Sequence, residues 1–171
     1  YIVLPGPPRE MQTMFSDQAV PWIRDNLGGA GVIPIYSHVL KFIGISESKL
    51  EDTFHDLFDH QTAPTLATLA TQGEIHLRLT ARTQDQESFK TLIAPVLDEI
   101  RTRAGKYIFA EGPVLLTEAI AGMLLQNNLT VSTAESCTGG LLSARFTEVP
   151  GSSAYFLGSI VAYSNDVKIK V

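Results

Sequence analysis

Residues 133–140 read Thr133-Ala134-Glu135-Ser136-Cys137-Thr138-Gly139-Gly140 and join two segments of different character. Residues 129–132 form an apolar, β-branched run that predicts a buried strand, and residues 141–146 predict a helix. A strand that enters a helix through small polar residues brings the free N–H groups and the positive dipole end of that helix to the strand end. With the strand predicted over 155–163, this order predicts an α/β sheet in which the ends of the two strands lie side by side and face one crevice at its carboxyl edge.

The turn allows either chemistry or a purely structural role. Ser136 and Cys137 are potential nucleophiles, and the glycines would let a phosphate or an oxyanion approach the backbone closely. The structural alternative is that Ser136 or Thr138 caps the helix, while Gly139 and Gly140 only permit a tight turn. Residue types and spacing leave both interpretations open.

Three ordered blocks in this part of the chain resemble one protein family. They are residues 134–140, residues 149–153 (Val-Pro-Gly-Ser-Ser) and residues 161–168 (Val-Ala-Tyr-Ser-Asn-Asp-Val-Lys). They closely resemble the opening of the C-terminal domain of CinA, the competence/damage-inducible protein family. The resemblance implies an amidase that hydrolyses nicotinamide mononucleotide to nicotinic acid mononucleotide and ammonia.

The same resemblance implies catalytic roles for three residues. Ser136 is the expected nucleophile, Lys168 the base and Tyr163 a proton-relay or orienting partner. The sequence has no histidine after residue 76, so a Ser-His pair within this segment is excluded. A lysine can replace the histidine where burial lowers its pKa. Cys137 is the rival nucleophile, since a thiolate at a helix N-terminus is reactive.

The resemblance also implies a substrate-binding set around the turn. The backbone amides of Thr138, Gly139 and Gly140 are expected to hold phosphate or oxyanion. Glu135 is expected to hydrogen-bond ligand hydroxyls or, alternatively, the turn itself. The expected partner is therefore a small-molecule substrate, nicotinamide mononucleotide, and no cofactor and no metal are expected.

Residues 32–111 predict a self-contained unit. The predicted strands and helices follow the order β-α-β-β-α-β, with strands over 34–42, 65–70, 74–81 and 107–110. The first helix, capped by Ser46, extends through Phe58 and carries Leu50, Phe54, Leu57 and Phe58 on one apolar face. The second helix begins at about Gln84. This order predicts one sheet with both helices on a single face. In CinA the corresponding unit is similar to a KH-type fold.

A KH-type fold makes a non-catalytic RNA-binding or assembly module the alternative function. Residues 33–110 contain eight Lys or Arg against ten Asp or Glu, and they contain no Gly-x-x-Gly loop. The whole chain has a net charge of −5, which gives no reason to expect a nucleic-acid or anionic-membrane partner. We therefore expect no nucleic acid, no membrane and a homodimer, with a spacer or dimer-contact role for this unit.

Residues 1–31 predict a short strand, Tyr1-Ile2-Val3-Leu4, a proline-rich turn, and a helix that starts at Pro8 or Arg9. The turn resembles the one that closes the N-terminal domain of CinA, which is similar to molybdopterin-binding domains and is associated with pyrophosphatase action on ADP-ribose. Residues 28–31, Gly-Gly-Ala-Gly, predict a linker. The expected domains are 1–31, the end of that N-terminal domain plus the linker; 32–111, KH-like; and 112–171, the opening of the amidase domain.

Composition sets the remaining expectations. One cysteine cannot form an internal disulfide, and no apolar run approaches the roughly 18 residues of a membrane span, so we expect a cytoplasmic protein. The chain begins without Met in a strand-like run and stops in a helix-like one. We expect an internal piece of a longer protein that is weakly active or inactive alone.

Overall fold

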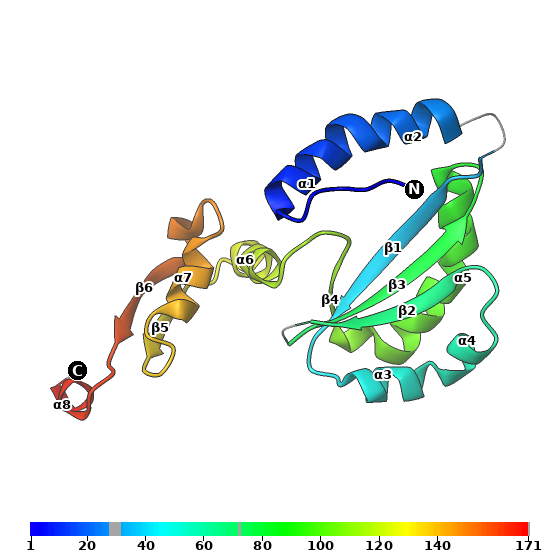
Figure 1. The fold of residues 1–171 in the computed structure, drawn as a ribbon. Helices are drawn as coiled ribbons and strands as arrows, with labels where there is room; N and C mark the ends of the chain where they lie inside the picture. The colour runs from blue at the N-terminus through cyan, green and yellow to red at the C-terminus, as the bar shows by residue number, and fades with distance from the viewer. Residues whose placement is uncertain (28–31, 72, 171) are drawn as a thin grey trace. The chain divides into compact units, whose positions relative to one another are not determined.

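The computed structural model describes residues 1–27, 32–71 and 73–170 (Figure 1). Contacts divide the chain into two compact units, the first built from the residues up to 36 together with 82–91, and the second from 37–81 together with the residues from 92 onward. The predicted linker, residues 28–31, lies outside the described residues. No helix within the described residues is long and apolar enough to cross a bilayer.

The first unit contains a helical run made of three consecutive elements: α1 (Pro8–Met14), a π-helical turn η1 (Phe15–Ala19) and α2 (Val20–Leu27). Helix α1 begins at Pro8, as predicted, because proline has no N–H to lose in the first turn. The π-helical turn precedes Pro21, which cannot donate the regular i→i−4 hydrogen bond. The strand predicted over residues 1–4 is wrong, since these residues pair with no described strand.

The middle of the chain forms a four-stranded sheet in the order β2-β3-β1-β4. Strand β2 pairs antiparallel with β3, and β1 pairs antiparallel with β4. Ile75, Leu77 and Leu79 on β3 are buried, whereas the alternating Arg78 is exposed. One face of the sheet is therefore covered, as the alternation predicts. The strands are β1 (Ile35–Phe42), β2 (Thr65–Ala70), β3 (Ile75–Arg82) and β4 (Ile108–Glu111).

The helices of this part are α3 (Glu47–Thr53), α4 (His55–Asp59) and α5 (Gln86–Ala104). Ser46 caps α3 as predicted, because its hydroxyl accepts a hydrogen bond from the Lys49 N–H at 3.3 Å. The single helix expected from Ser46 through Phe58 is interrupted at Phe54, whose φ of −116° and ψ of 20° are not helical. Its ring is fully buried. The other buried apolar side chains of the second unit outside β3 include Leu40, Phe42, Leu50, Leu66, Ile93, Leu97, Ile100 and Ala104.

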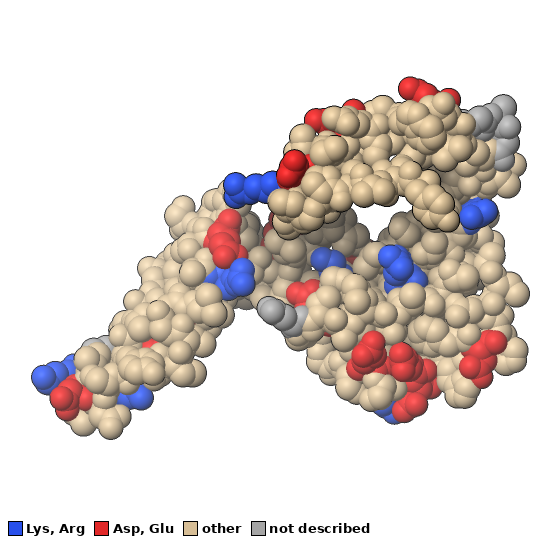
Figure 2. Space-filling model, viewed as in Figure 1, with Lys and Arg blue, Asp and Glu red and all other residues tan. Residues whose placement is uncertain are grey.

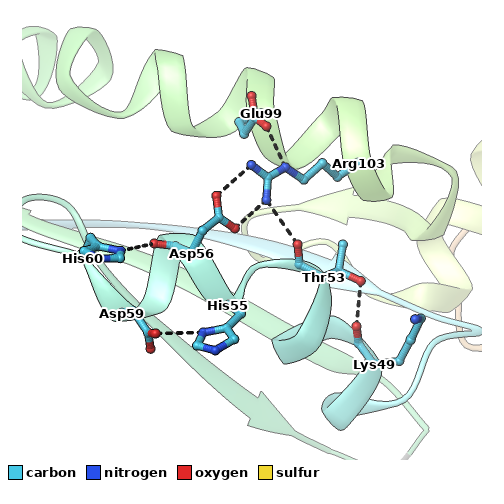
Figure 3. Close-up of polar contacts among 8 residues, drawn as sticks. All are labelled: Lys49, Thr53, His55, Asp56, Asp59, His60, Glu99 and Arg103. Carbon is cyan, nitrogen blue, oxygen red and sulfur yellow. Dashed lines mark hydrogen bonds and ion pairs between the residues drawn. The ribbon is translucent and has the colours of Figure 1, made fainter.

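Arg103 joins α5 to α4 (Figure 3). Its guanidinium makes two parallel hydrogen bonds to Asp56, of 2.6 and 2.8 Å, and its Nε donates to Glu99 at 2.6 Å. It also donates to the main-chain oxygen of Thr53 at 3.2 Å. These hydrogen bonds raise the pKa of Arg103 and lower the pKa of Asp56 below its usual 3.8. One arginine thus bonds both sides of the break at Phe54.

We expect Arg103→Gln to lower the thermal unfolding midpoint by a few degrees at pH 6, where the wild-type ion pair is intact. Because the folded-state pKa of Asp56 is lowered, its contribution is present above pH 3.8 and is lost as pH falls below that value. The difference between variant and wild type should therefore shrink toward pH 2. Lys90→Gln on the same helix is the control, and a variant difference that does not depend on pH would contradict this account.

His55 and His60 lie beside this network and take separate partners. The His55 Nδ1 lies 2.9 Å from the Asp59 carboxylate. The pKa of His55 is raised, first by a backbone hydrogen bond and then by the charge of Asp59. The His60 Nδ1 lies 3.2 Å from the Asp56 main-chain oxygen. Among the described residues, no group of three or more His, Cys, Asp or Glu side chains is arranged to hold a metal ion.

The segment after β4 is fastened to β1. The N–H of Gly112 donates to the Val39 oxygen at 2.8 Å, and the ammonium of Lys41, only 6% exposed, donates to the Val114 oxygen at 2.7 Å. Helix α6 (Leu116–Gln126) follows. The amphipathic pattern of residues 114–126 predicts that Met123 faces inward, but this prediction is wrong, since its side chain is 64% exposed.

Candidate active site

The last part of the chain is a β-α-β unit. Strands β5 (Val131–Glu135) and β6 (Phe156–Val161) pair in parallel, and α7 (Leu141–Thr147) and the 3-10 turn η3 (Ser152–Ala154) connect them. The carboxyl ends of parallel neighbouring strands meet at one sheet edge. Glu135 is in register with Val161, and the Ala162 N–H donates to the Glu135 oxygen at 2.8 Å. Ser136 and Ala162 therefore start from the same edge, which confirms the predicted adjacency of the two strand ends.

The turn between β5 and α7 is closed by its own backbone. The Gly139 N–H donates to the Ser136 oxygen at 3.1 Å, and the Leu141 N–H donates to the Thr138 oxygen at 3.0 Å. Gly139 has a φ of +60° and Gly140 a φ of +101°, in the left-handed region that favours glycine. Ser136 is half-buried and Cys137 is exposed. The turn thus keeps the serine close to the sheet edge and leaves the thiol in solvent.

The Glu135 side chain accepts hydrogen bonds at both of its carboxylate oxygens. One carboxylate oxygen accepts the N–H groups of Gly140 and Leu142, each at 3.0 Å, and the other accepts the Ser143 N–H at 2.8 Å and the Ser143 hydroxyl. These hydrogen bonds, the Ser143 hydroxyl foremost, lower the pKa of Glu135 from its usual 4.5 to about 2. Glu135 is expected to hydrogen-bond either ligand hydroxyls or the turn itself. The structure shows the hydrogen bonds to the turn and the α7 start, and the carboxylate does not face outward to ligand hydroxyls.

The three amides that are expected to hold an anion differ in their hydrogen bonds. The Gly139 N–H is bonded to Ser136 and the Gly140 N–H to Glu135, so neither amide is free to hold a phosphate or an oxyanion. Within the described part of the chain, the Thr138 N–H has no bonded acceptor and remains a candidate donor. The glycines therefore serve the geometry of the turn.

The expected base and relay lie beyond β6. Tyr163 is 72% exposed, and Ser164 caps α8 (Asn165–Lys170) by accepting the Val167 N–H at 3.4 Å. Lys168 lies exposed on this short helix. Among residues 1–27, 32–71 and 73–170, no hydrogen bond joins the side chain of Tyr163 or Lys168 to Ser136. The structure brings the chain segments together but does not join the three side chains.

Two residues of the site were not predicted from the sequence. Ser143 donates to Glu135 and lies 2.9 Å from the Thr133 hydroxyl, so it connects the helix to β5. Tyr155 is fully buried, and its hydroxyl donates to the Phe146 oxygen at 2.8 Å. An acidic residue shortly before a helix is a known capping signal, and it indicates the turn as one partner of Glu135, but it does not identify Ser143 as a donor.

The fold and the turn define a chain with a KH-type domain followed by an α/β part that carries a serine at a strand end. Residues 37–110 match the family model described as the damage-inducible protein CinA KH domain, and residues 115–171 match the CinA C-terminal domain. Together the two models match more than half of the chain. The chain belongs to the CinA family.

Curated relatives align with nearly the whole chain. A "CinA-like protein" of Dictyoglomus turgidum is 49% identical over 169 residues, and a "Putative competence-damage inducible protein" of Moorella thermoacetica is 47% identical over 170 residues. Each alignment covers 99% of this chain and 40% of the relative, so the chain spans about two fifths of their length. A crystal structure of a CinA superfamily protein from Escherichia coli matches 33% of each chain at 30% identity, with a TM-score of 0.32.

Proposed function

We propose that residues 115–171 supply the nucleophile of an amidase that hydrolyses nicotinamide mononucleotide. The observation that supports it is the parallel pairing of β5 with β6, because Ser136 and the segment that leads to Tyr163 and Lys168 leave the same sheet edge. The resemblance of the surrounding sequence to the CinA C-terminal domain supplies the reaction. The full-length gene product that carries this sequence is the proposed enzyme.

The chemistry requires three groups. The Ser136 oxygen forms a bond to the carboxamide carbon while the Lys168 amine accepts the hydroxyl proton. That proton passes to the nitrogen as the C–N bond breaks, and the nitrogen leaves as ammonia. Water then cleaves the acyl ester and restores the serine. Tyr163 orients or relays the proton, and the Thr138 N–H is the candidate donor to the oxyanion.

A nucleic-acid ligand is a weaker candidate for the KH-type domain. On the face shown in Figure 2, acidic side chains gather over α3 and α4, whereas Lys and Arg occur singly. A polyanion needs a basic stripe that neutralises several phosphates. We therefore favour a small-molecule substrate, with the KH-type domain as a spacer or dimer contact.

Ammonia release from nicotinamide mononucleotide, measured for the full-length gene product, tests the proposal. We expect Lys168→Ala to lower kcat about 100-fold or more, since it removes the proton acceptor. Lys170→Ala on the same helix is the matched control and should stay within about twofold. A wild-type protein that releases no ammonia, or equal losses in both variants, would contradict the proposal.

A further inference from the structure

We propose that Glu135 is a positioning residue for Ser136, an inference that rests on the proposed function. Glu135 is 5% exposed, directly precedes Ser136, and accepts hydrogen bonds from three backbone N–H groups and one hydroxyl of the α7 start. A buried carboxylate with this many donors is fixed in one orientation. Its side chain therefore determines where α7 begins relative to the nucleophile.

The main chain of Glu135 is hydrogen-bonded to the segment that follows β6, on the side away from α7's contacts with the carboxylate. Its carbonyl oxygen accepts the Ala162 N–H, one residue before Tyr163. A single residue thus fastens the α7 start through its side chain and the end of β6 through its backbone. Loosening the side chain frees the turn that carries Ser136 and weakens its register against the segment that leads to Tyr163.

The same contacts determine where a ligand anion does not bind. The free N–H groups of a helix start attract phosphate, but here a carboxylate of the chain itself already occupies them. A nucleotide phosphate at this position would meet a like charge with no donor left to share. The phosphate of the substrate is therefore bound by groups other than the Gly140, Leu142 and Ser143 amides.

Glu135→Gln in the full-length gene product tests the proposal, because it keeps the size of the side chain and removes its charge. Either orientation of the new amide turns an NH₂ group toward at least one backbone N–H. We expect kcat for ammonia release from nicotinamide mononucleotide to fall about 10- to 100-fold, with KM changed less than about threefold, since the carboxylate does not touch substrate. A raised KM with unchanged kcat would overturn the proposal and make Glu135 a substrate ligand.

Amide hydrogen exchange provides a readout that does not depend on catalysis. We expect exchange at Gly140, Leu142, Ser143 and Ala162 to be on the order of tenfold faster in Glu135→Gln, and Ser143→Ala, which removes one donor of four, to show a smaller change. Unchanged exchange in Glu135→Gln would refute the positioning role. A wild-type protein that releases no ammonia would instead remove the proposed function, and the exchange rates would still decide whether Glu135 holds the turn.

Discussion

In the full-length gene product, Ser136→Ala should abolish the proposed ammonia release from nicotinamide mononucleotide, lowering kcat at least about a thousandfold, because the proposed acyl ester cannot form without the hydroxyl. The substitution removes one oxygen from a half-buried position at the end of β5. The hydrogen bonds that close the turn use the Ser136 main-chain oxygen and Glu135, so they remain in the variant. Steady-state kinetics and unchanged amide exchange of the turn would separate lost chemistry from lost structure.

Cys137→Ala distinguishes the two candidate nucleophiles. The Cys137 thiol is exposed, whereas the preceding Ser136 is half-buried at the sheet edge. If serine is the nucleophile, Cys137→Ala should retain most of the activity. A Ser136→Ala variant with an unchanged rate, together with an inactive Cys137→Ala variant, would identify the Cys137 thiol as the nucleophile.

Phe54→Ala should lower the free energy of unfolding by about 3–5 kcal/mol, because it opens a ring-sized cavity in the core of the KH-type domain. Phe54 is fully buried and separates α3 from α4. Surrounding side chains can collapse only partly into such a space. Urea denaturation of the chain, followed by circular dichroism, measures the change.

Leu69→Ala is the matched control on the same domain. Leu69 lies on β2 with 61% of its surface exposed, so its truncation removes little buried area. We expect a change within about 0.5 kcal/mol. Equal effects of the two substitutions would contradict the assignment of Phe54 to the core.

The sequence predicted the KH-type sheet well, most clearly at β3, because this strand alternates in burial. Ile75, Leu77 and Leu79 alternate with His76 and Arg78, and this period is determined locally. The break at Phe54 was not predictable, since apolar spacing along one face is the same for a continuous helix and for two short ones. The prediction of a strand over residues 1–4 was wrong because a strand also requires a hydrogen-bonded partner strand, and the local residue pattern does not show whether one is present.

At the site, the sequence predicted the order of strand, turn and helix and the shared strand edge. It ended the strand at residue 132, whereas β5 extends to Glu135, and it did not predict which groups accept the hydrogen bonds of the turn. The order of strand, turn, helix and strand leads to parallel pairing, and the glycines indicate left-handed backbone. Whether Glu135 faces a ligand or the protein depends on the distance from its carboxylate to Ser143, eight residues away. Such a contact depends on the path of α7, which local residue patterns do not specify.

The bonds that fasten residues 112–114 to β1 bear on where this chain can be divided. The KH family model ends at residue 110. However, the Lys41 ammonium donates to the Val114 oxygen, and the Gly112 N–H donates to the Val39 oxygen. A piece ending at Ala110 would keep a buried ammonium and remove the carbonyl that accepts from it, which is costly for a charged group. The smallest piece that satisfies this domain's own polar groups therefore extends through Val114, four residues beyond the boundary drawn from sequence similarity.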